Sequence, residues 1–161
     1  MEILTFPLAG EHFGIVAQTV EEIRAWEGAT RIPTLPDYVK GVVNLRGSIV
    51  PIVDLRNRFG METLIPVATS VVVYLCAGSK SRRVGLLIDD VPTIVNVENA
   101  ELLTPANLGS HIDLSFLRAL IDLDGALTML LNEEALVDED AMYQPLAQVR
   151  IATANESAKA G

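Results

Sequence analysis

The sequence predicts an all-β protein, a barrel or a sandwich, with one late helix. Short apolar runs rich in β-branched residues recur along the chain, and glycine, proline and asparagine separate them. Aromatic residues make up only 5% of the 161 residues. The strand-rich sequence falls into two halves that separate near residues 60–67, which predicts two small barrels. Because neither half is large enough to be stable alone, we expect them to share a core.

The first half opens with a predicted hairpin. Strand-like runs at Ile3–Leu8 and His12–Val16 flank a glycine-containing turn. The residues that follow, Thr19–Ala25, predict a brief helical turn, because Val20 and Ile23 fall on one side of it.

The next segment is the most informative in the chain. After an extended entry fixed by two prolines, Val42-Val43 and Ile49–Leu55 are apolar runs of strand length. Between them, Asn44–Gly47 predicts a tight turn that presents the lone cation of Arg46. No acid, nucleophile or metal ligand lies beside Arg46 in the sequence. The turn therefore indicates contact with a partner more than chemistry.

The second half continues the pattern of strands. Strand-like runs lie at Ser70–Cys76, Arg83–Val91, Thr93–Val97, Phe116–Leu123 and Ala126–Leu131. Pro92 predicts a bend or a sheet edge, and residues 98–115 predict a long connection. Asp124-Gly125 is a strong hairpin signal. Asn132 predicts the N-cap of a helix that ends before Pro145.

Composition limits the class of protein. The net charge of −9, from 12 basic and 21 acidic residues, argues against nucleic-acid partners and anionic membranes. A single cysteine, Cys76, excludes an internal disulfide and suits a reducing cytosol. No apolar run is long enough to span a bilayer and no signal peptide is recognised, so we expect a cytoplasmic protein without direct membrane insertion.

The sequence shows no pattern typical of an enzyme or a cofactor site. His12 and His111 lack metal-ligand spacing, and Ser110 beside His111 rarely achieves nucleophile-to-base geometry. We interpret Asp89-Asp90 as a solvated strand end, and Trp26 as either a partner anchor or a core residue. A solvated helix face is the interpretation for the acidic cluster of Glu133, Glu134, Asp138, Glu139 and Asp140.

The segment from Val39 to Arg56 closely resembles the hallmark of the CheW family, the adaptor proteins of bacterial chemosensory arrays. The family pattern is Val-x-Gly-Val-x-Asn-Leu-Arg-Gly-x-Ile-x-Pro-Ile-x-Asp-Leu-Arg. Its fixed positions are met by Val39, Gly41, Val42, Asn44, Leu45, Arg46, Gly47, Ile49, Pro51, Ile52, Asp54, Leu55 and Arg56. The resemblance extends over most of the chain and includes Val20–Ile23, Val84–Val91 and Asp124–Leu131.

The resemblance implies a particular fold. We expect two SH3-like five-stranded β-barrels, packed side by side around a shared core, with a short C-terminal helix. The N-terminal strand is a candidate to complete the second barrel. Residues 1–144 would form this domain, divided near 60–67, and residues 145–161 would form a flexible tail.

The resemblance also implies a function. The protein would be a non-catalytic adaptor that couples transmembrane chemoreceptors to a CheA-type histidine autokinase. Its partners would be the regulatory domain of that kinase and the cytoplasmic tips of methyl-accepting chemoreceptors. On the receptor face, the matching positions are Val20, Glu22, Gly41 and Arg46. No position of the kinase face carries over with enough specificity to name.

One alternative comes from a different class. A small β-barrel hydrolase or ligand-binding protein would have the same strand pattern, but it needs a polar pocket that the sequence does not reveal. Weak self-association is a further expectation, because open barrels leave unpaired strand edges.

Overall fold

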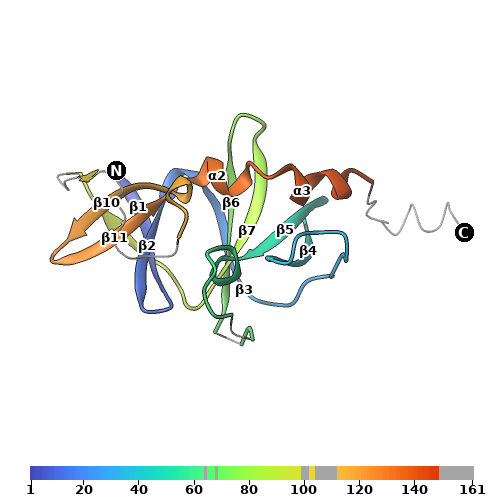
Figure 1. The fold of residues 1–161 in the computed structure, drawn as a ribbon, viewed down its shortest axis with the longest axis horizontal. Coiled ribbons are helices and arrows are strands. Elements are labelled where there is room, and N and C mark those ends of the chain that lie inside the picture. Colours follow the sequence, from blue (N-terminus) through green and yellow to red (C-terminus); the bar gives the residue numbers. More distant parts are fainter. Residues whose placement is uncertain (64, 68, 99–101, 104–111, 149–161) are drawn as a thin grey trace, which may run out of the picture.

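Two β-sheets form the framework of the chain (Figure 1). A computed structural model describes residues 1–63, 65–67, 69–98, 102–103 and 112–148. One sheet has five strands in the order β3-β6-β7-β5-β4, and the other has six in the order β8-β1-β2-β11-β10-β9. The sixth, β9, is only two residues long. This mainly-β, two-unit fold confirms the predicted fold class.

The strands of the six-stranded sheet come from both ends of the chain. They are β1 (Glu2–Leu8), β2 (Glu11–Val16), β8 (Thr93–Asn96), β9 (Leu102–Leu103), β10 (Leu117–Leu123) and β11 (Ala126–Leu131). The five-stranded sheet comprises β3 (Val20–Ala25), β4 (Val39–Leu45), β5 (Ser48–Asp54), β6 (Val71–Ala77) and β7 (Arg82–Ile88). Short helices and 3-10 turns connect them: η1 (Ala17–Thr19), α1 (Leu55–Arg58), η2 (Leu114–Phe116), α2 (Glu133–Val137), α3 (Asp140–Tyr143) and η3 (Gln144–Gln148).

Three tight turns explain the three hairpins that the sequence predicts. Ala9-Gly10, Arg46-Gly47 and Asp124-Gly125 all have positive φ at both residues. Such turns match the right-handed twist of the flanking strands, and glycine adopts their second position without strain. The antiparallel pairs β1–β2, β4–β5 and β10–β11 follow directly.

The division between the two units does not lie near residues 60–67, where we expected it. This segment joins α1 to β6, so it connects two parts of the same five-stranded sheet. The chain changes sheet twice instead, between β2 and β3 and between β7 and β8. The predicted helical turn at Thr19–Ala25 is also wrong, because Val20–Ala25 pairs with β6 as a strand. A short run with apolar residues three apart does not distinguish a helix from an edge strand.

Both sheets bury one face in the same core. From the six-stranded sheet, Phe6 and Phe13 are fully buried, and from the five-stranded sheet Val73 and Leu75 are too. Alternate residues of the same strands face smaller cores that belong to each sheet alone, such as Val72 and Tyr74 in one and Ile3 in the other. The large shared core therefore lies between the sheets, as predicted.

All four phenylalanines of the chain form a continuous row through this core. The ring centroids are 6.2 Å apart for Phe6–Phe13, 5.6 Å for Phe13–Phe59 and 5.5 Å for Phe59–Phe116. Phe59 follows α1 of the five-stranded unit, whereas the other three belong to the six-stranded unit or its flanks. Phe59 thus contributes the five-stranded unit's ring to the row.

Two arginines after β5 add polar links. The Arg58 guanidinium lies 4.3 Å from the Tyr38 ring centroid and 4.4 Å from the Phe116 ring centroid. Together these two cation–π contacts link the two units. Arg56 donates from Nε to Asp89 Oδ1 at 3.0 Å. Asp89 is therefore paired, and our interpretation of it as a merely solvated strand end is wrong.

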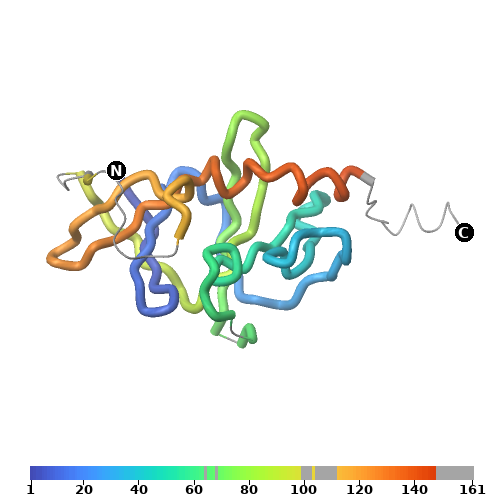
Figure 2. Tube along the Cα trace, in the orientation of Figure 1, coloured from blue at the N-terminus to red at the C-terminus, as the bar shows by residue number. Residues whose placement is uncertain are grey.

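The C-terminal segment crosses from one unit to the other (Figures 1 and 2). After β11, α2 and α3 pass over the β6–β7 hairpin, where Arg82 Nη2 lies 2.7 Å from Asp140 Oδ1. The Tyr143 hydroxyl donates to the Arg83 carbonyl at 3.0 Å, and burial raises the pKa of this hydroxyl. Leu146 is buried in the shared core. The described structure thus extends into the predicted 145–161 tail, and residues 149–161 lie outside the described residues.

We expect Phe59→Ala to lower the free energy of unfolding by about 3–5 kcal/mol, because it removes a buried ring shared by both units. Calorimetry should still show one transition, at a lower temperature, since the units cannot melt separately without exposing the shared core. The exposed Leu127 provides the control, and Leu127→Ala should cost less than about 1 kcal/mol. Two separate transitions in either variant would contradict a shared core.

We expect Asp140→Asn to lower the thermal midpoint at about pH 7, and we expect the difference from wild type to shrink as the pH falls below about 4. A hydrogen bond from Arg82, aided by Lys80, lowers the pKa of Asp140 below its ordinary value of 3.8. A carboxyl group with a lowered pKa stabilises the fold above its unfolded pKa, and this contribution disappears as the pH falls through the folded pKa. Melting curves of both proteins across this range check it. A difference that persists at the lowest pH would show that Asp140 acts through something other than its charge.

Candidate partner-binding surface

The tip of the β4–β5 hairpin presents Arg46, as the sequence predicts. The closing pair of the ladder is Leu45–Ser48, and Asn44 Oδ1 accepts the Gly47 N–H at 2.8 Å. The Arg46 side chain is 75% exposed. The turn geometry explains the glycine but not the arginine, because the same geometry occurs with alanine at residue 9.

Arg46 is not a lone cation, which corrects our expectation. Its Nη2 lies 3.4 Å from Glu22 Oε2 on β3, and the other oxygen of Glu22 accepts a hydrogen bond from Arg24. The Glu22 side chain is only 19% exposed, and its Oε2 accepts no hydrogen bond with good geometry. The bond to Glu22 raises the pKa of Arg24. We call Glu22, Arg24 and Arg46 the charged cluster.

Closure of the five-stranded sheet brings these residues together. β3 and β4 are its two opposite edges. Beyond β3, however, Thr30 bridges to Val42 on β4, with N–O distances of 2.9 Å and 2.8 Å for the two backbone hydrogen bonds. The sheet thus closes into a barrel, and Glu22 on one edge meets Arg46 at the end of the other.

Gly41 lies at this closure for a steric reason. A Cβ added there would lie 2.6 Å from the Thr30 carbonyl oxygen and 2.9 Å from the Ala29 Cβ. Any side chain would push the crossing segment away from β4. Gly41 therefore contributes to the surface through the backbone, by letting the two edges approach.

Val20 starts β3 but has a different environment from the charged cluster. It is half-buried and packs against the shared core, and an irregularity in the β3–β6 ladder separates it from Glu22. Of the four residues predicted for the receptor face, the structure pairs Glu22 with Arg46 and places Gly41 at the closure. Their role in binding stays a prediction.

The sequence did not indicate Arg24 or the pocket beside the cluster. This pocket, of about 170 Å³, is lined by Arg24 and Trp26 from one edge of the barrel, Asn44 from the other and Tyr74 from β6. Trp26 is partly buried against the smaller core of the five-stranded sheet. Burial raises the pKa of the Tyr74 hydroxyl. The signal that could have found Arg24 is its spacing of two residues from Glu22, which places both side chains on one face of a strand.

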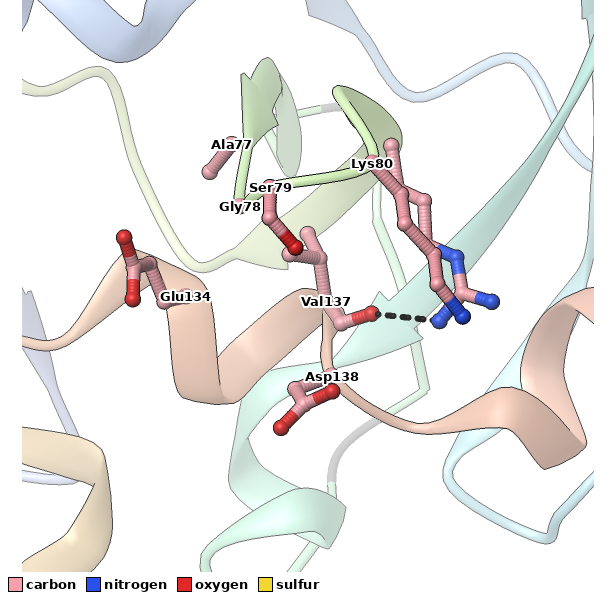
Figure 3. A pocket seen from close by; sticks show the side chains of 8 residues that line it. Ala77, Gly78, Ser79, Lys80, Glu134, Val137 and Asp138 are labelled. Atoms are coloured by element: carbon pink, nitrogen blue, oxygen red, sulfur yellow. Dashed lines mark hydrogen bonds between the residues drawn. The ribbon is translucent and has the colours of Figure 1, made fainter.

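Two further cavities are lined by described residues. A pocket of about 130 Å³ lies between the β6–β7 turn and α2, where Glu134 and Lys80 stand on opposite sides and Arg82 donates to the Val137 carbonyl (Figure 3). A hollow of about 550 Å³ beside Met1 has Glu2 and Glu98 among its lining residues. Among the described residues, no three His, Cys, Asp or Glu side chains could hold a metal ion. Ser110 and His111 lie outside the described residues.

Comparisons with known proteins identify the family of the chain. The CheW-like domain family matches residues 2–141. The chemotaxis protein CheW of Rhizobium meliloti is 35% identical over 135 residues, which are 84% of this chain and 86% of that protein. The chemotaxis protein CheW of Klebsiella aerogenes is 36% identical over 142 residues, covering 88% and 84%.

A solved structure is also similar. The scaffolding protein TtCheW from Thermoanaerobacter tengcongensis superposes with a TM-score of 0.77 at 25% identity, over 87% of this chain and 89% of that one. The fold thus defines a scaffold of two β-units around a shared core. The chain belongs to the CheW-like domain family.

We expect Gly41→Ala to lower the free energy of unfolding by about 1–3 kcal/mol, because the new methyl group overlaps the Thr30 carbonyl. Gly10 is the control, since a Cβ there would meet nothing within 4 Å. Its φ of +80° strains any side chain, but asparagine tolerates this region better than most residues, so Gly10→Asn should cost about 1 kcal/mol or less, from the backbone alone. Denaturant unfolding measures both. Equal, small losses would show that the closure tolerates a side chain at Gly41.

Proposed function

We propose that this chain is a chemotaxis coupling adaptor. It links the cytoplasmic tips of methyl-accepting chemoreceptors to the regulatory domain of a CheA-type histidine kinase, and it acts in the cytoplasm. Family membership and the names of the relatives as chemotaxis proteins support this. Among the described residues, none of the helices has the length and apolar character needed to cross a bilayer.

The observation that carries the receptor-binding part is the charged cluster. Two arginines flank one carboxylate, and the more exposed of them stands on a hairpin tip held by a closed barrel. Because the frame is rigid, the guanidinium of Arg46 presents directed donors at low entropic cost to a partner. A helical receptor tip with acceptor side chains fits such a surface. Val20, Glu22, Gly41 and Arg46 are the residues that we assign to it.

The adaptor transmits a signal by contact rather than by a reaction. A receptor that changes conformation binds the charged cluster with a different free energy in each state. The shared core joins the receptor-binding barrel to the other sheet, so the two move as one body. The kinase then experiences a change in contact geometry that biases its own equilibrium.

Exposed strand edges support the contact with the kinase. In the described residues, β8 is an edge strand whose Ile94 is 63% exposed. An unpaired edge with apolar side chains fits a partner of similar barrel architecture. We also propose that the same edge supports weak self-association.

A small hydrolase or ligand-binding protein was the alternative. Its assignment would rest on a pocket with converging polar groups, whereas the matched family is the CheW-like domain and the relatives are named chemotaxis proteins. The family assignment decides between the two.

We expect Arg46→Ala to weaken binding to a receptor-tip fragment about tenfold and to leave the thermal midpoint within a few degrees of wild type. The side chain is largely exposed, so its ion pair with Glu22 contributes little to folding. The alanine variant, however, can no longer donate the directed hydrogen bonds that the arginine makes to the partner. Arg46→Lys should also bind weakly, because an ammonium group cannot reproduce the planar fork. Calorimetric titration and melting curves measure the two effects.

Lys80 supplies the matched control, as a second exposed cation in a hairpin turn, 65% exposed. Lys80→Ala should bind the receptor fragment like wild type, and all variants should bind the isolated kinase regulatory domain equally. If Arg46→Ala unfolds the protein, the residue is structural. If it binds the receptor fragment normally, the receptor surface lies elsewhere.

A further inference from the structure

Glu133 is buried, although the sequence predicted a solvated helix face. Its residue exposure is 1%, and it begins α2 directly after the six-stranded sheet. Oε1 accepts the Val16 N–H at 2.9 Å, and Oε2 lies 2.9 Å from Arg118 Nη2. A buried carboxylate is costly unless it is paired and bonded. An apolar side chain would fill the same space at lower cost, so the hydrogen bond to Val16 is the feature to explain.

Val16 is the last residue of β2, where the chain leaves the six-stranded sheet. The parallel ladder between β2 and β11 covers His12–Gly14 and stops there. Glu133 comes two residues after the end of β11. Its carboxylate therefore takes the place of the next ladder acceptor and holds the end of β2 from 117 residues away in the sequence.

A short series of bonds leads from Val16 to the charged cluster. Thr19 Oγ1 donates to the Val16 carbonyl at 2.8 Å, and the Val20 N–H donates to the Ala17 carbonyl. Val20 is the first residue of β3, and Glu22 is two residues further on. In Figure 1, α2 lies beside the segment that joins β2 to β3. A displacement at Val16 thus reaches β3 across one 3-10 turn.

We propose that Glu133 is a positioning residue for the charged cluster. By completing the hydrogen bonding of β2, it fixes the direction in which the chain enters β3, and so the place where Glu22 meets Arg46. The effect on receptor binding rests on the proposed function, but the effect on β3 does not. A purely stabilising role would weaken every contact of the protein alike, whereas a positioning role weakens the receptor contact selectively.

The test compares four variants of the full chain. Glu133→Ala removes the acceptor, and Glu133→Gln keeps an acceptor oxygen for the Val16 N–H. Arg118→Gln removes only the ion pair, and Glu134→Ala alters the exposed neighbour on the same helix. Each is measured for amide hydrogen exchange, for binding to the receptor-tip fragment and for binding to the kinase regulatory domain.

We expect Glu133→Ala to speed exchange at the Val16 and Val20 amides and to weaken receptor binding about tenfold, with kinase binding changed less than about twofold. The other three variants should remain within about threefold of wild type for the receptor. If Glu133→Ala does not fold, Thr19→Val replaces it, because it breaks the next bond of the series. It should show the same selective loss.

Two results would overturn the proposal. One is unchanged receptor binding and exchange in Glu133→Ala, or in Thr19→Val where that variant replaces it. The other is an equal loss of receptor and kinase binding, which marks a general loss of structure. If the wild-type protein itself does not bind the receptor fragment, the proposed function fails, and exchange at Val20 still decides whether Glu133 positions β3.

Discussion

The shared core is the constraint on which the rest of the structure depends. Each sheet is too small to bury its apolar face alone, so both bury it against the other. The row of four phenylalanines is part of this core: the ring of Phe59, from the five-stranded unit, lies in line with three rings from the six-stranded unit and its flanks. The helices after β11 then extend the contact, since Tyr143 and Leu146 both lie against it. The two barrels are therefore one mechanical body.

Closure of the five-stranded sheet into a barrel determines where Glu22 and Arg46 present their charges. The two hydrogen bonds between Thr30 and Val42 join the sheet's edges, and Gly41 leaves room for them. Glu22 and Arg46 are 24 positions apart, yet they meet because their strands are the edges that close. A surface built this way combines exposed charge with a backbone that loses little entropy on binding.

The sequence predicted local structure better than it predicted contacts between residues far apart in the chain. Turn chemistry identified the hairpins at Ala9-Gly10 and Asp124-Gly125, since φ and side-chain preferences act within a few residues. The predicted boundary between the two units near 60–67 was wrong. Strand pairing depends on which apolar faces meet in the folded chain, and no local sequence pattern contains that information. Glu133 was predicted to be solvated for the same reason: its burial is set by the end of a distant strand. Arg46 was identified from its turn, but its pairing with Glu22 required the closed barrel.

The parallel pairing of β2 with β11 has a consequence for synthesis. The first hairpin leaves the ribosome early, but its partner strand lies more than a hundred residues later in the chain. Until β11 emerges, the outer edge of β2 has no native partner, although the five-stranded sheet can already cover Phe6 and Phe13. Contacts between residues so distant also slow folding, because a long loop must close before they form. The newly made chain is thus exposed to aggregation during translation, and chaperones that hold apolar hairpins would act in this interval.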